Sequence, residues 1–272
     1  MASITHSVKS FFASCYWLTT TGKWRIEDLF DDLYEGQTRS PTFRGIFSEI
    51  YGDDYAEEAD PSGFVTMSDL RNIAEHFNVG GEQTFVDLAC GRGGAGLWVA
   101  RETGARLIGI DISKVAVEQA AGRIADFGLA GRARFQVGDF CATGLPEASF
   151  DGAISVDSLF LVPDKTASVH EAARILRPGA RFVFTNWEVH LPLMVKDYHG
   201  LLENAGFEIE VYDEPPDWRR RQRAVYENIL AKKEILIKEM GKASAKVWIQ
   251  DAQTEMPRLE HMKRIFVVAK KG

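Results

Sequence analysis

One short segment constrains the fold of this chain more than any other: a glycine-rich loop between a buried strand and a helix. It reads VDLACGRGGAG from Val86 to Gly96, within an apolar run at Thr84–Ala89 and a helical pattern at Gly94–Thr103. Glycines at such a place allow a tight turn and let a ligand approach the backbone. The segment therefore predicts a ligand-binding loop at the edge of a parallel sheet.

The loop begins a regular alternation of strands and helices. Further apolar runs predict six more strands, at Arg106–Asp111, Ala133–Gly138, Gly152–Val156, Arg181–Thr185, Phe207–Tyr212 and Arg264–Ala269. Helical patterns lie at Lys114–Phe127, Lys165–Leu176 and Leu193–Ala205, and from Trp218 to about Lys246. This rhythm is typical of an α/β fold, a Rossmann-like and mostly parallel sheet covered by helices on both faces.

The length and the charge of the chain limit its domain organisation and its partners. A chain of 272 residues suits one domain with an elaboration. We expect a helical arm and cap over residues 1–78 and a core over 79–272, with a helical insertion at about 214–260. The net charge of −7 disfavours a nucleic-acid partner. It is uneven, because Glu27 to Asp60 holds eleven acids against two bases, whereas Asp217 to Lys246 holds nine bases against four acids.

Cysteines and apolar stretches add further exclusions. The three cysteines, Cys15, Cys90 and Cys141, are far apart and form no metal-binding or disulfide pattern. We therefore expect no metal site and a reducing, cytoplasmic location. No stretch approaches the roughly 20 apolar residues that span a bilayer, so no membrane partner is expected. The chain is compatible with a monomer or a homodimer.

The glycine loop is compatible with two cofactor classes. From Gly91 it spells GxGxxG, and Asp111 follows twenty residues later, as in a protein that binds a nicotinamide dinucleotide. Against that class, Asp87 precedes the loop, where a carboxylate would oppose a pyrophosphate. Asp139 and Asp157 add acids at the ends of later strands. These positions favour a cationic, adenosine-containing ligand with a free amino group, although a nicotinamide enzyme remains an alternative.

The motifs in order resemble one known family. DLACGRGG, GIDIS, GDF, FDGAISVDSLFLVPDK and EAARILRPGARFVFT are similar to the class I S-adenosylmethionine-dependent methyltransferases, and within them to the branch of ubiquinone, phosphobase, sterol and natural-product enzymes. The resemblance is strong from Gln83 to Tyr212. It implies S-adenosylmethionine as the cofactor and a seven-stranded sheet whose last strand is antiparallel.

The resemblance also implies roles for individual residues. The cofactor-binding positions are Asp87, Ala89, Gly91 and Gly93 around its methionine part, Asp111 at the ribose, Ile112, Asp139 and Phe140 at the adenine, Asp157 and Ser158 on the methionine side, and Thr66 in the cap. Two positions depart from the family pattern. Ala89 replaces the usual first glycine of the loop, and Leu161 replaces a His that takes part in catalysis in some phosphobase enzymes.

Candidate residues on the substrate side follow the fifth strand or lie in the late insertion. His190 or Glu188 could act as a general base, and Tyr34 of the cap could close the pocket or contact the sulfonium. We also expect substrate contacts from Asn186, Trp187, Trp218, Arg219 and Tyr226.

The resulting prediction is methyl transfer to an O, N or C nucleophile of a small molecule, in specialised natural-product biosynthesis. A phosphobase or amine N-methyltransferase is the alternative within the class, and Leu161 speaks against it. A nicotinamide oxidoreductase and a non-catalytic cofactor-binding protein are the alternatives outside it.

Overall fold

The computed structural model describes residues 25–189 and 197–272. Residues 1–24 of the predicted arm, the start of the helix predicted at Leu193–Ala205, and the candidate base His190 lie outside the described residues. The described strands are β1 (Thr84–Leu88), β2 (Arg106–Asp111), β3 (Ala133–Val137), β4 (Phe150–Val156), β5 (Leu176–Val189), β6 (Phe207–Asp213) and β7 (Met262–Lys271). The α-helices are α2 (Ile26–Gln37), α3 (Pro41–Tyr51), α4 (Met67–Phe77), α5 (Gly94–Thr103), α6 (Lys114–Gly122), α7 (Lys165–Ile175), α8 (His199–Asn204), α9 (Trp218–Ala231), α10 (Lys233–Met240) and α11 (Lys242–Glu255). Three short 3₁₀ helices are η1 (Gly52–Asp54), η2 (Leu159–Leu161) and η3 (Met256–His261).

All seven strands form one sheet in the order β3-β2-β1-β4-β5-β7-β6. β1 to β5 pair in parallel, with Val86 opposite Ile108 and Phe85 opposite Gly152. β7 lies between β5 and β6 and is antiparallel to both. The predicted fold class, with its antiparallel last strand, is therefore confirmed.

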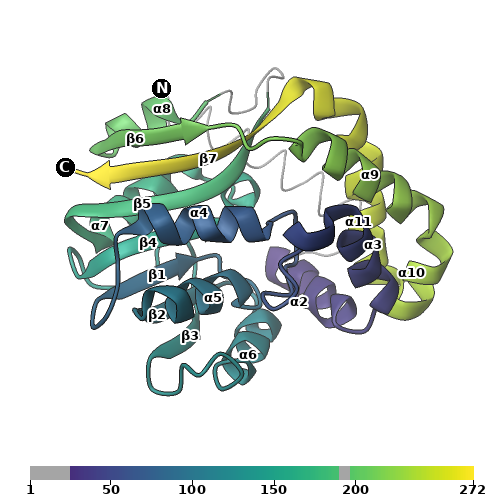
Figure 1. Ribbon diagram of the computed structural model, residues 1–272, viewed down its shortest axis with the longest axis horizontal. Helices are drawn as coiled ribbons and strands as arrows, with labels where there is room; N and C mark the ends of the chain where they lie inside the picture. Colours follow the sequence, from purple (N-terminus) through teal and green to yellow (C-terminus); the bar gives the residue numbers. More distant parts are fainter. Residues whose placement is uncertain (1–24, 190–196) are drawn as a thin grey trace.

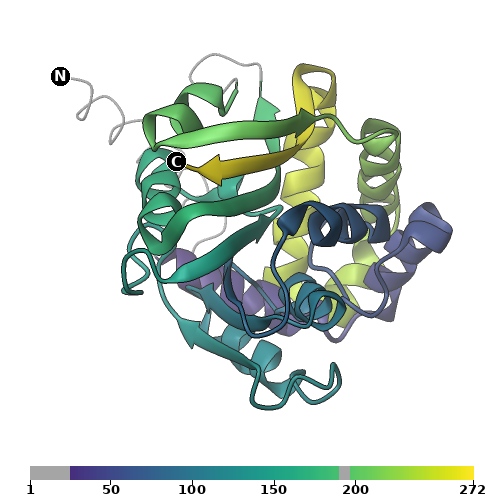
Figure 2. The same ribbon diagram turned by 60° about the vertical axis from the view of Figure 1, so that its left-hand side comes forward.

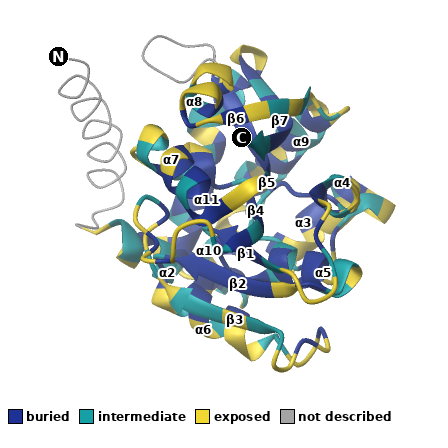
Figure 3. Cartoon of the chain, turned by 90° about the vertical axis from the view of Figure 1, so that its left-hand side faces the viewer, coloured by how far each residue is buried: buried dark blue, intermediate teal, exposed yellow. Residues whose placement is uncertain are grey.

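The sheet is covered by helices because its strands alternate apolar side chains between two faces. Phe85 and Val183 pack with residues of α4 and α5 in one buried cluster. Their neighbours Val86 and Phe184 pack with residues of α7 and α8 in another. Figure 3 shows β1 and β4 coloured as buried, with exposed residues on outer helices such as α6. This burial makes the sheet the rigid frame of the site.

A helical cap stands at one end of the sheet. It consists of α2, α3, α9, α10 and α11, which Figure 1 shows gathered beyond the end at which the parallel strands terminate. Figure 2 shows the early helices and the late insertion side by side, and Phe43 of α3 packs on Trp248 of α11 at 4.8 Å between ring centroids. Their apolar side chains form a third buried cluster. The acidic and basic segments of the sequence thus form one structural unit.

Several boundaries differ from the sequence prediction. The stretch from Trp218 to Lys246 holds three helices rather than one, because α9 ends at Ala231 and Gly241, at φ +84°, ends α10 before α11 begins. The helix predicted to reach Phe127 ends at Gly122. α4 lies within the predicted cap range of residues 1–78, yet it packs against the sheet through Leu70, so the described cap comprises α2 and α3 of that range.

Among the described residues, no helix combines the length and the apolar character needed to cross a membrane.

Candidate functional site

The end of β1 carries a buried carboxylate. Asp87 is 1 % exposed, and its Oδ2 has no hydrogen-bond partner among the described residues. Gly96 allows this placement, since a Cβ there would lie 2.5 Å from Asp87 Oδ2. Burial, followed by the charge of Asp111, raises the pKa of Asp87 to about 7, although a hydrogen bond from the backbone of Gly96 lowers it. A buried carboxylate with one unpartnered oxygen would be stabilised by a cationic group of a ligand.

The loop after β1 turns through the left-handed region three times. Ala89, Gly91 and Gly93 have φ values of +58°, +52° and +74°. A Cβ on Gly93 would come within 2.7 Å of the Phe135 ring, so glycine is required there. Of these three residues Ala89 is not a glycine, and its methyl group carries a conformational cost of roughly 1–2 kcal/mol. The turn brings the N-terminus of α5 to the edge of the sheet.

Asp111 at the end of β2 links this loop to the next strand. Its Oδ2 accepts a hydrogen bond from the backbone N–H of Gly91 at 2.7 Å, and its Oδ1 accepts one from Ser113 at 2.9 Å. Burial raises its pKa to about 6, and these two hydrogen bonds lower it. Each oxygen keeps a further lone pair, so the carboxylate can accept from two hydroxyl groups of a ribose.

The cap helix α2 lies over this edge. Asp31 accepts hydrogen bonds from the Ser113 hydroxyl and from the backbone N–H of Val115, at the start of α6. One turn later, the Tyr34 hydroxyl lies 3.0 Å from where a Cβ of Gly91 would stand. Tyr34 is buried, and burial raises its pKa well above the ordinary value. The Tyr34 side chain of the cap therefore lies next to the glycine loop.

The predicted adenine-side residues flank β2 and β3. Ile112 is half-buried, Phe140 is 4 % exposed, and Asp139 is exposed with Oδ1 accepting from the backbone N–H of Cys141. They lie in loops after neighbouring strands of the sheet. The structure therefore brings them to the same edge as Asp111.

Asp157 ends β4 in a strained conformation. Its φ is +50°, and its Oδ1 accepts hydrogen bonds from Thr185 at 2.7 Å and from Arg264 at 3.0 Å. Its Oδ2 has no partner among the described residues. The next residue, Ser158, shares a hydrogen bond of 2.6 Å with Ser155. Non-glycine residues in this region cost of the order of 1–3 kcal/mol and concentrate at functional sites.

Sequence reasoning missed the buried cation that holds Asp157. Arg264 of β7 is 2 % exposed, binds Asp69 of α4 at 2.9 Å as well as Asp157, and lies 5.5 Å from the centre of the Trp187 ring. Thr66 caps α4 in a reciprocal box with Asp69. The spacing of that box, Thr-x-x-Asp, is visible in the sequence. Nothing in the sequence identifies Arg264 as its partner.

Glu188 and Trp187 lie on opposite faces of β5. The Tyr212 hydroxyl donates to the Glu188 carboxylate, which is 3 % exposed. Trp187 packs instead in the cap cluster, edge to face with Phe64 at 5.7 Å. Asn186 Oδ1 accepts from the backbone N–H of Phe160 at 2.9 Å. Of the three side chains, that of Trp187 faces the cap.

The predicted residues of the insertion have different surroundings. Arg219 donates to the carbonyls of Leu259 at 3.0 Å and Met262 at 2.9 Å, so it ties α9 to β7. Trp218 lines a cavity. Tyr226 is 1 % exposed and donates to Asp251 of α11 at 2.8 Å. Asp251 was missed because its partner lies 25 residues away.

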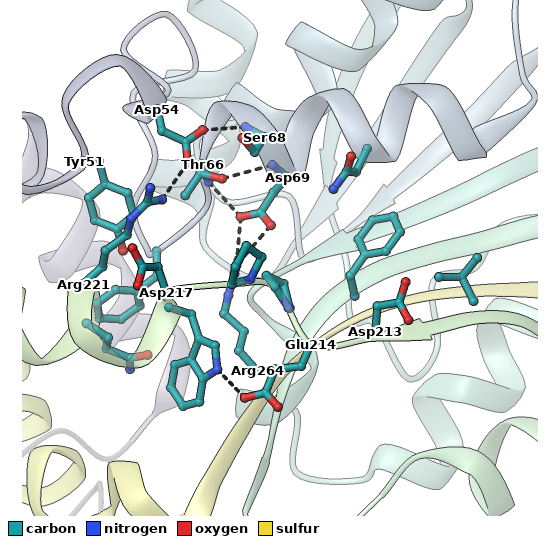
Figure 4. A pocket seen from close by; sticks show the side chains of 18 of the residues that line it. Tyr51, Asp54, Thr66, Ser68, Asp69, Asp213, Glu214, Asp217, Arg221 and Arg264 are labelled. Atoms are coloured by element: carbon teal, nitrogen blue, oxygen red, sulfur yellow. Dashed lines mark hydrogen bonds and ion pairs between the residues drawn. The ribbon is translucent and has the colours of Figure 1, made fainter.

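That cavity measures about 590 Å³ and lies between α4, the β6–β7 edge and the start of α9. Figure 4 shows Arg264 and Asp69 joined at one side of it and Arg221 and Asp54 at another. Its other lining residues include Phe64 and Gln222. Arg264 lines the cavity and also pairs with Asp157, so one side chain connects the cavity wall to the residue that follows β4.

Fold and site together define a class of protein. A sheet with its last strand inserted antiparallel, a glycine loop after β1 and acids at the ends of β1, β2 and β4 form a Rossmann-like site for an adenosine-containing cofactor. The unpartnered Oδ2 of the buried Asp87 fits a cationic ligand rather than a pyrophosphate.

A family model matches part of the chain. Residues 85–179 match the family model described as a methyltransferase domain. The chain contains a methyltransferase domain of the class I S-adenosylmethionine-dependent type, and S-adenosylmethionine is the cofactor of that class.

Individual relatives are similar over part of the chain. A probable tocopherol O-methyltransferase of Oryza sativa subsp. japonica is 37 % identical over 39 % of this chain and 29 % of its own length. Methyltransferase GfsG of Streptomyces halstedii is 29 % identical over 48 % of this chain and 49 % of its own length. This chain thus spans less than half the length of these curated relatives. Among solved structures, the [4+2]-cyclase SpnF superposes with a TM-score of 0.63 and 25 % identity, covering 74 % of this chain and 80 % of its own.

Proposed function

We propose that this protein binds S-adenosylmethionine at the carboxyl edge of the sheet and transfers its methyl group to an O, N or C nucleophile of a small molecule in specialised biosynthesis. One observation carries the proposal. Asp87 and Asp111 lie at the carboxyl ends of adjacent strands on either side of a glycine loop, and Oδ2 of Asp87 has no partner among the described residues. The printed names of relatives such as tocopherol O-methyltransferase support a small-molecule acceptor.

The residues present fit the cofactor. Asp87 would stabilise its ammonium group, Asp111 would accept from both ribose hydroxyls, and Phe140 and Ile112 would bound the adenine. When bound, S-adenosylmethionine supplies an already activated sulfonium methyl group. The protein's contribution is then chiefly positioning, which can supply roughly 7–11 kcal/mol of the barrier.

The cap would exclude water from the reaction. α2 is fixed to the start of α6 through Asp31, and Tyr34 stands against Gly91. Movement of α2 would admit the cofactor, and its return would enclose it. His190 and Glu188 are the candidate bases that the sequence offers, and Glu188 accepts from Tyr212 on the face of β5 away from the cap. Tyr34 is the cap residue next to the loop.

A second candidate function is cofactor binding without methyl transfer. The observation that favours it is that one structure of this fold, with a TM-score of 0.63, is described as a [4+2]-cyclase. A phosphobase or amine acceptor is the alternative within methyl transfer, and it is supported by the fold of a phosphoethanolamine N-methyltransferase 2 of Haemonchus contortus, with a TM-score of 0.65.

The test is incubation of the purified chain with methyl-tritiated S-adenosylmethionine and a panel of phenols, terpenoids, amines and phosphobases. We expect label in an extractable small molecule and one S-adenosylhomocysteine formed per methyl transferred. Binding of S-adenosylhomocysteine without transfer to any member of the panel favours the second candidate. Absence of binding overturns both.

We further propose that the reaction takes place in the cytoplasm and that the protein acts as a monomer or a homodimer. Light scattering with size-exclusion chromatography decides between the two states. Fractionation of cells that express the tagged chain tests the location, and a membrane-bound fraction would contradict it.

A further inference from the structure

A continuous chain of hydrogen bonds crosses the cap behind the cavity. Trp187 Nε1 donates to Gln222 Oε1 at 3.1 Å, Gln222 Nε2 donates to Tyr226 Oη at 3.0 Å, and Tyr226 Oη donates to Asp251 Oδ2 at 2.8 Å. Trp187, Gln222 and Tyr226 are 3 %, 3 % and 1 % exposed. The chain joins β5, α9 and α11, so it is formed only when the insertion packs on the sheet.

Both ends of this chain fix the orientation of the Gln222 amide. The indole N–H of Trp187 can only donate, so the atom facing it must be the amide oxygen. Burial raises the pKa of Asp251 to about 7, with the hydrogen bond from Tyr226 lowering it and the charge of Glu255 raising it. At pH 8 the carboxylate is therefore ionised and can only accept, which makes Tyr226 the donor to it. A flipped amide would place two donors face to face at Trp187.

Gln222 is the member of the chain that lines the cavity. One of its two amide hydrogens and one lone pair of its oxygen are used within the chain. Among the described residues, the second amide hydrogen has no acceptor, so it can be donated to an oxygen atom of a ligand. The wall around it mixes polar and apolar side chains, and its large rings are those of Tyr51, Phe64, Trp218 and Phe266.

The charges of the cavity are balanced or exposed. Arg221 pairs with Asp54 at 2.6 Å, and Arg264 pairs with Asp69 at 2.9 Å. The other acidic lining residues are exposed to solvent: Asp213, Glu214 and Asp217. No buried charge among the described lining residues is left to recognise an ionic ligand, because each buried one already has a partner of opposite sign.

We propose that Gln222 is a specificity-determining residue of the acceptor site, which binds the hydroxyl or carbonyl oxygen of a neutral, ring-bearing molecule, and that Trp187, Tyr226 and Asp251 position its amide. This inference rests on the proposed function, since it names the acceptor class of the same site. An amide held in one orientation by hydrogen bonds discriminates well between ligands. A ligand analogue without the oxygen leaves the buried N–H of the amide unpaired.

The test uses four probes with one ring system: 1-naphthol, naphthalene, 1-naphthyl phosphate and 1-naphthylmethylamine. Their affinities for the full-length protein saturated with S-adenosylhomocysteine are measured at pH 8 from tryptophan fluorescence. We expect 1-naphthol to bind roughly fivefold more tightly than naphthalene, as for one hydrogen bond, and more tightly than either charged probe.

Substitutions then assign the preference to Gln222. Gln222→Met should bind 1-naphthol and naphthalene equally, and Gln222→Glu, which keeps the volume but cannot donate at pH 8, should also lose the preference. Tyr226→Phe removes one support and should reduce it. Gln253→Met is the matched control, since Gln253 is an exposed glutamine of α11, and it should keep the preference of the wild type.

The outcomes separate this inference from the proposed function. Failure to bind S-adenosylhomocysteine contradicts the proposed function itself. If the protein binds S-adenosylhomocysteine, the inference is overturned by a charged probe that binds best, by equal or absent binding of all four probes, or by an unchanged preference in Gln222→Met.

Discussion

At the end of β1, the groups that would hold the cofactor come from ten consecutive residues, Asp87 to Gly96, and from Asp111 on the adjacent strand. On the acceptor side, Trp187, Gln222 and Asp251 come from a strand and two helices spread over 65 positions, and they meet only through hydrogen bonds across the cap. The first region is built by local turns on a buried sheet. The second exists only as a product of packing between remote segments.

This difference explains where each region gains its stability. The cofactor loop depends on positive φ values and on backbone hydrogen bonds to Asp111, which any chain with the same local sequence can form. The acceptor side depends on contacts between the sheet and the cap, such as the hydrogen bond from Trp187 to Gln222. Beside them, the ion pairs of Arg264 join β7 to α4 and to the end of β4. Substitutions in the cofactor loop should therefore change cofactor affinity, whereas substitutions on the acceptor side should change how the cap packs on the sheet.

The largest expected effect is the loss of stability when the ion pairs of Arg264 are removed. Arg264→Gln leaves the carboxylates of Asp69 and Asp157 buried without their cation, and the free energy of unfolding should fall by about 3–5 kcal/mol. Guanidinium chloride unfolding followed by circular dichroism measures it. Arg223→Gln removes an exposed ion pair with Glu260 and should change stability by less than about 0.5 kcal/mol. Equal losses of unfolding free energy in the two variants would contradict the stability assigned to the ion pairs of Arg264.

The next effect is on the cofactor loop. Asp111→Ala removes the acceptor for Gly91 and for the ribose hydroxyls, so affinity for S-adenosylhomocysteine should fall roughly hundredfold, or about 3 kcal/mol, as for hydrogen bonds to a charged group. Calorimetric titration measures it, with exposed Asp126→Ala as the control. Gln222→Met should leave this affinity unchanged. A similar loss in Gln222→Met would remove the distinction between the two regions.

The sequence predicts the cofactor region far better than the acceptor side. The order of strands and helices and the acids at the strand ends were predicted, because their signals are local: apolar period, glycine turns and an aspartate after each run. Gln222, Asp251 and Arg264 carry no such signal. A glutamine, an aspartate and an arginine within helical or apolar patterns are ordinary solvated residues until distant partners surround them. The break at Gly241 was missed because its apolar neighbours keep the helical period.

A third effect is on pH dependence at Asp87. Its pKa of about 7 in the free protein lies above the roughly 3.9 of an unfolded chain. The folded state therefore holds this proton more tightly, and the stability of the free protein should fall as the pH rises from about 4 to 7. A cationic ligand favours the ionised form, so affinity for S-adenosylhomocysteine should rise up to about tenfold per pH unit below pH 7 and level off above it.

Titrations between pH 5.5 and 7.5, each in two buffers of different ionisation enthalpy, measure the proton released on binding. In Asp87→Asn the release and the slope should both fall, and the part that remains should lie near pH 6, where Asp111 titrates. A release and a slope that are unchanged in this variant would assign the titration to another group.

The smallest effect is on Ala89. Its φ of +58° suits glycine, so Ala89→Gly should raise the free energy of unfolding by about 1 kcal/mol and leave S-adenosylhomocysteine affinity nearly unchanged. Thermal unfolding measures the first and calorimetry the second. Ala125→Gly, in the segment after α6, is a control for the entropic cost of a new glycine and should not stabilise the protein. A destabilised Ala89→Gly would contradict the strain assigned to this turn.

The identity of the cofactor is the claim on which the rest depends. It is tested most directly by titrating the wild-type protein separately with S-adenosylhomocysteine and with NADH at pH 7.5. The account predicts one-to-one binding of S-adenosylhomocysteine and no heat of binding with NADH, because Asp87 stabilises an ammonium group and opposes a pyrophosphate. Binding of NADH together with no binding of S-adenosylhomocysteine would contradict it.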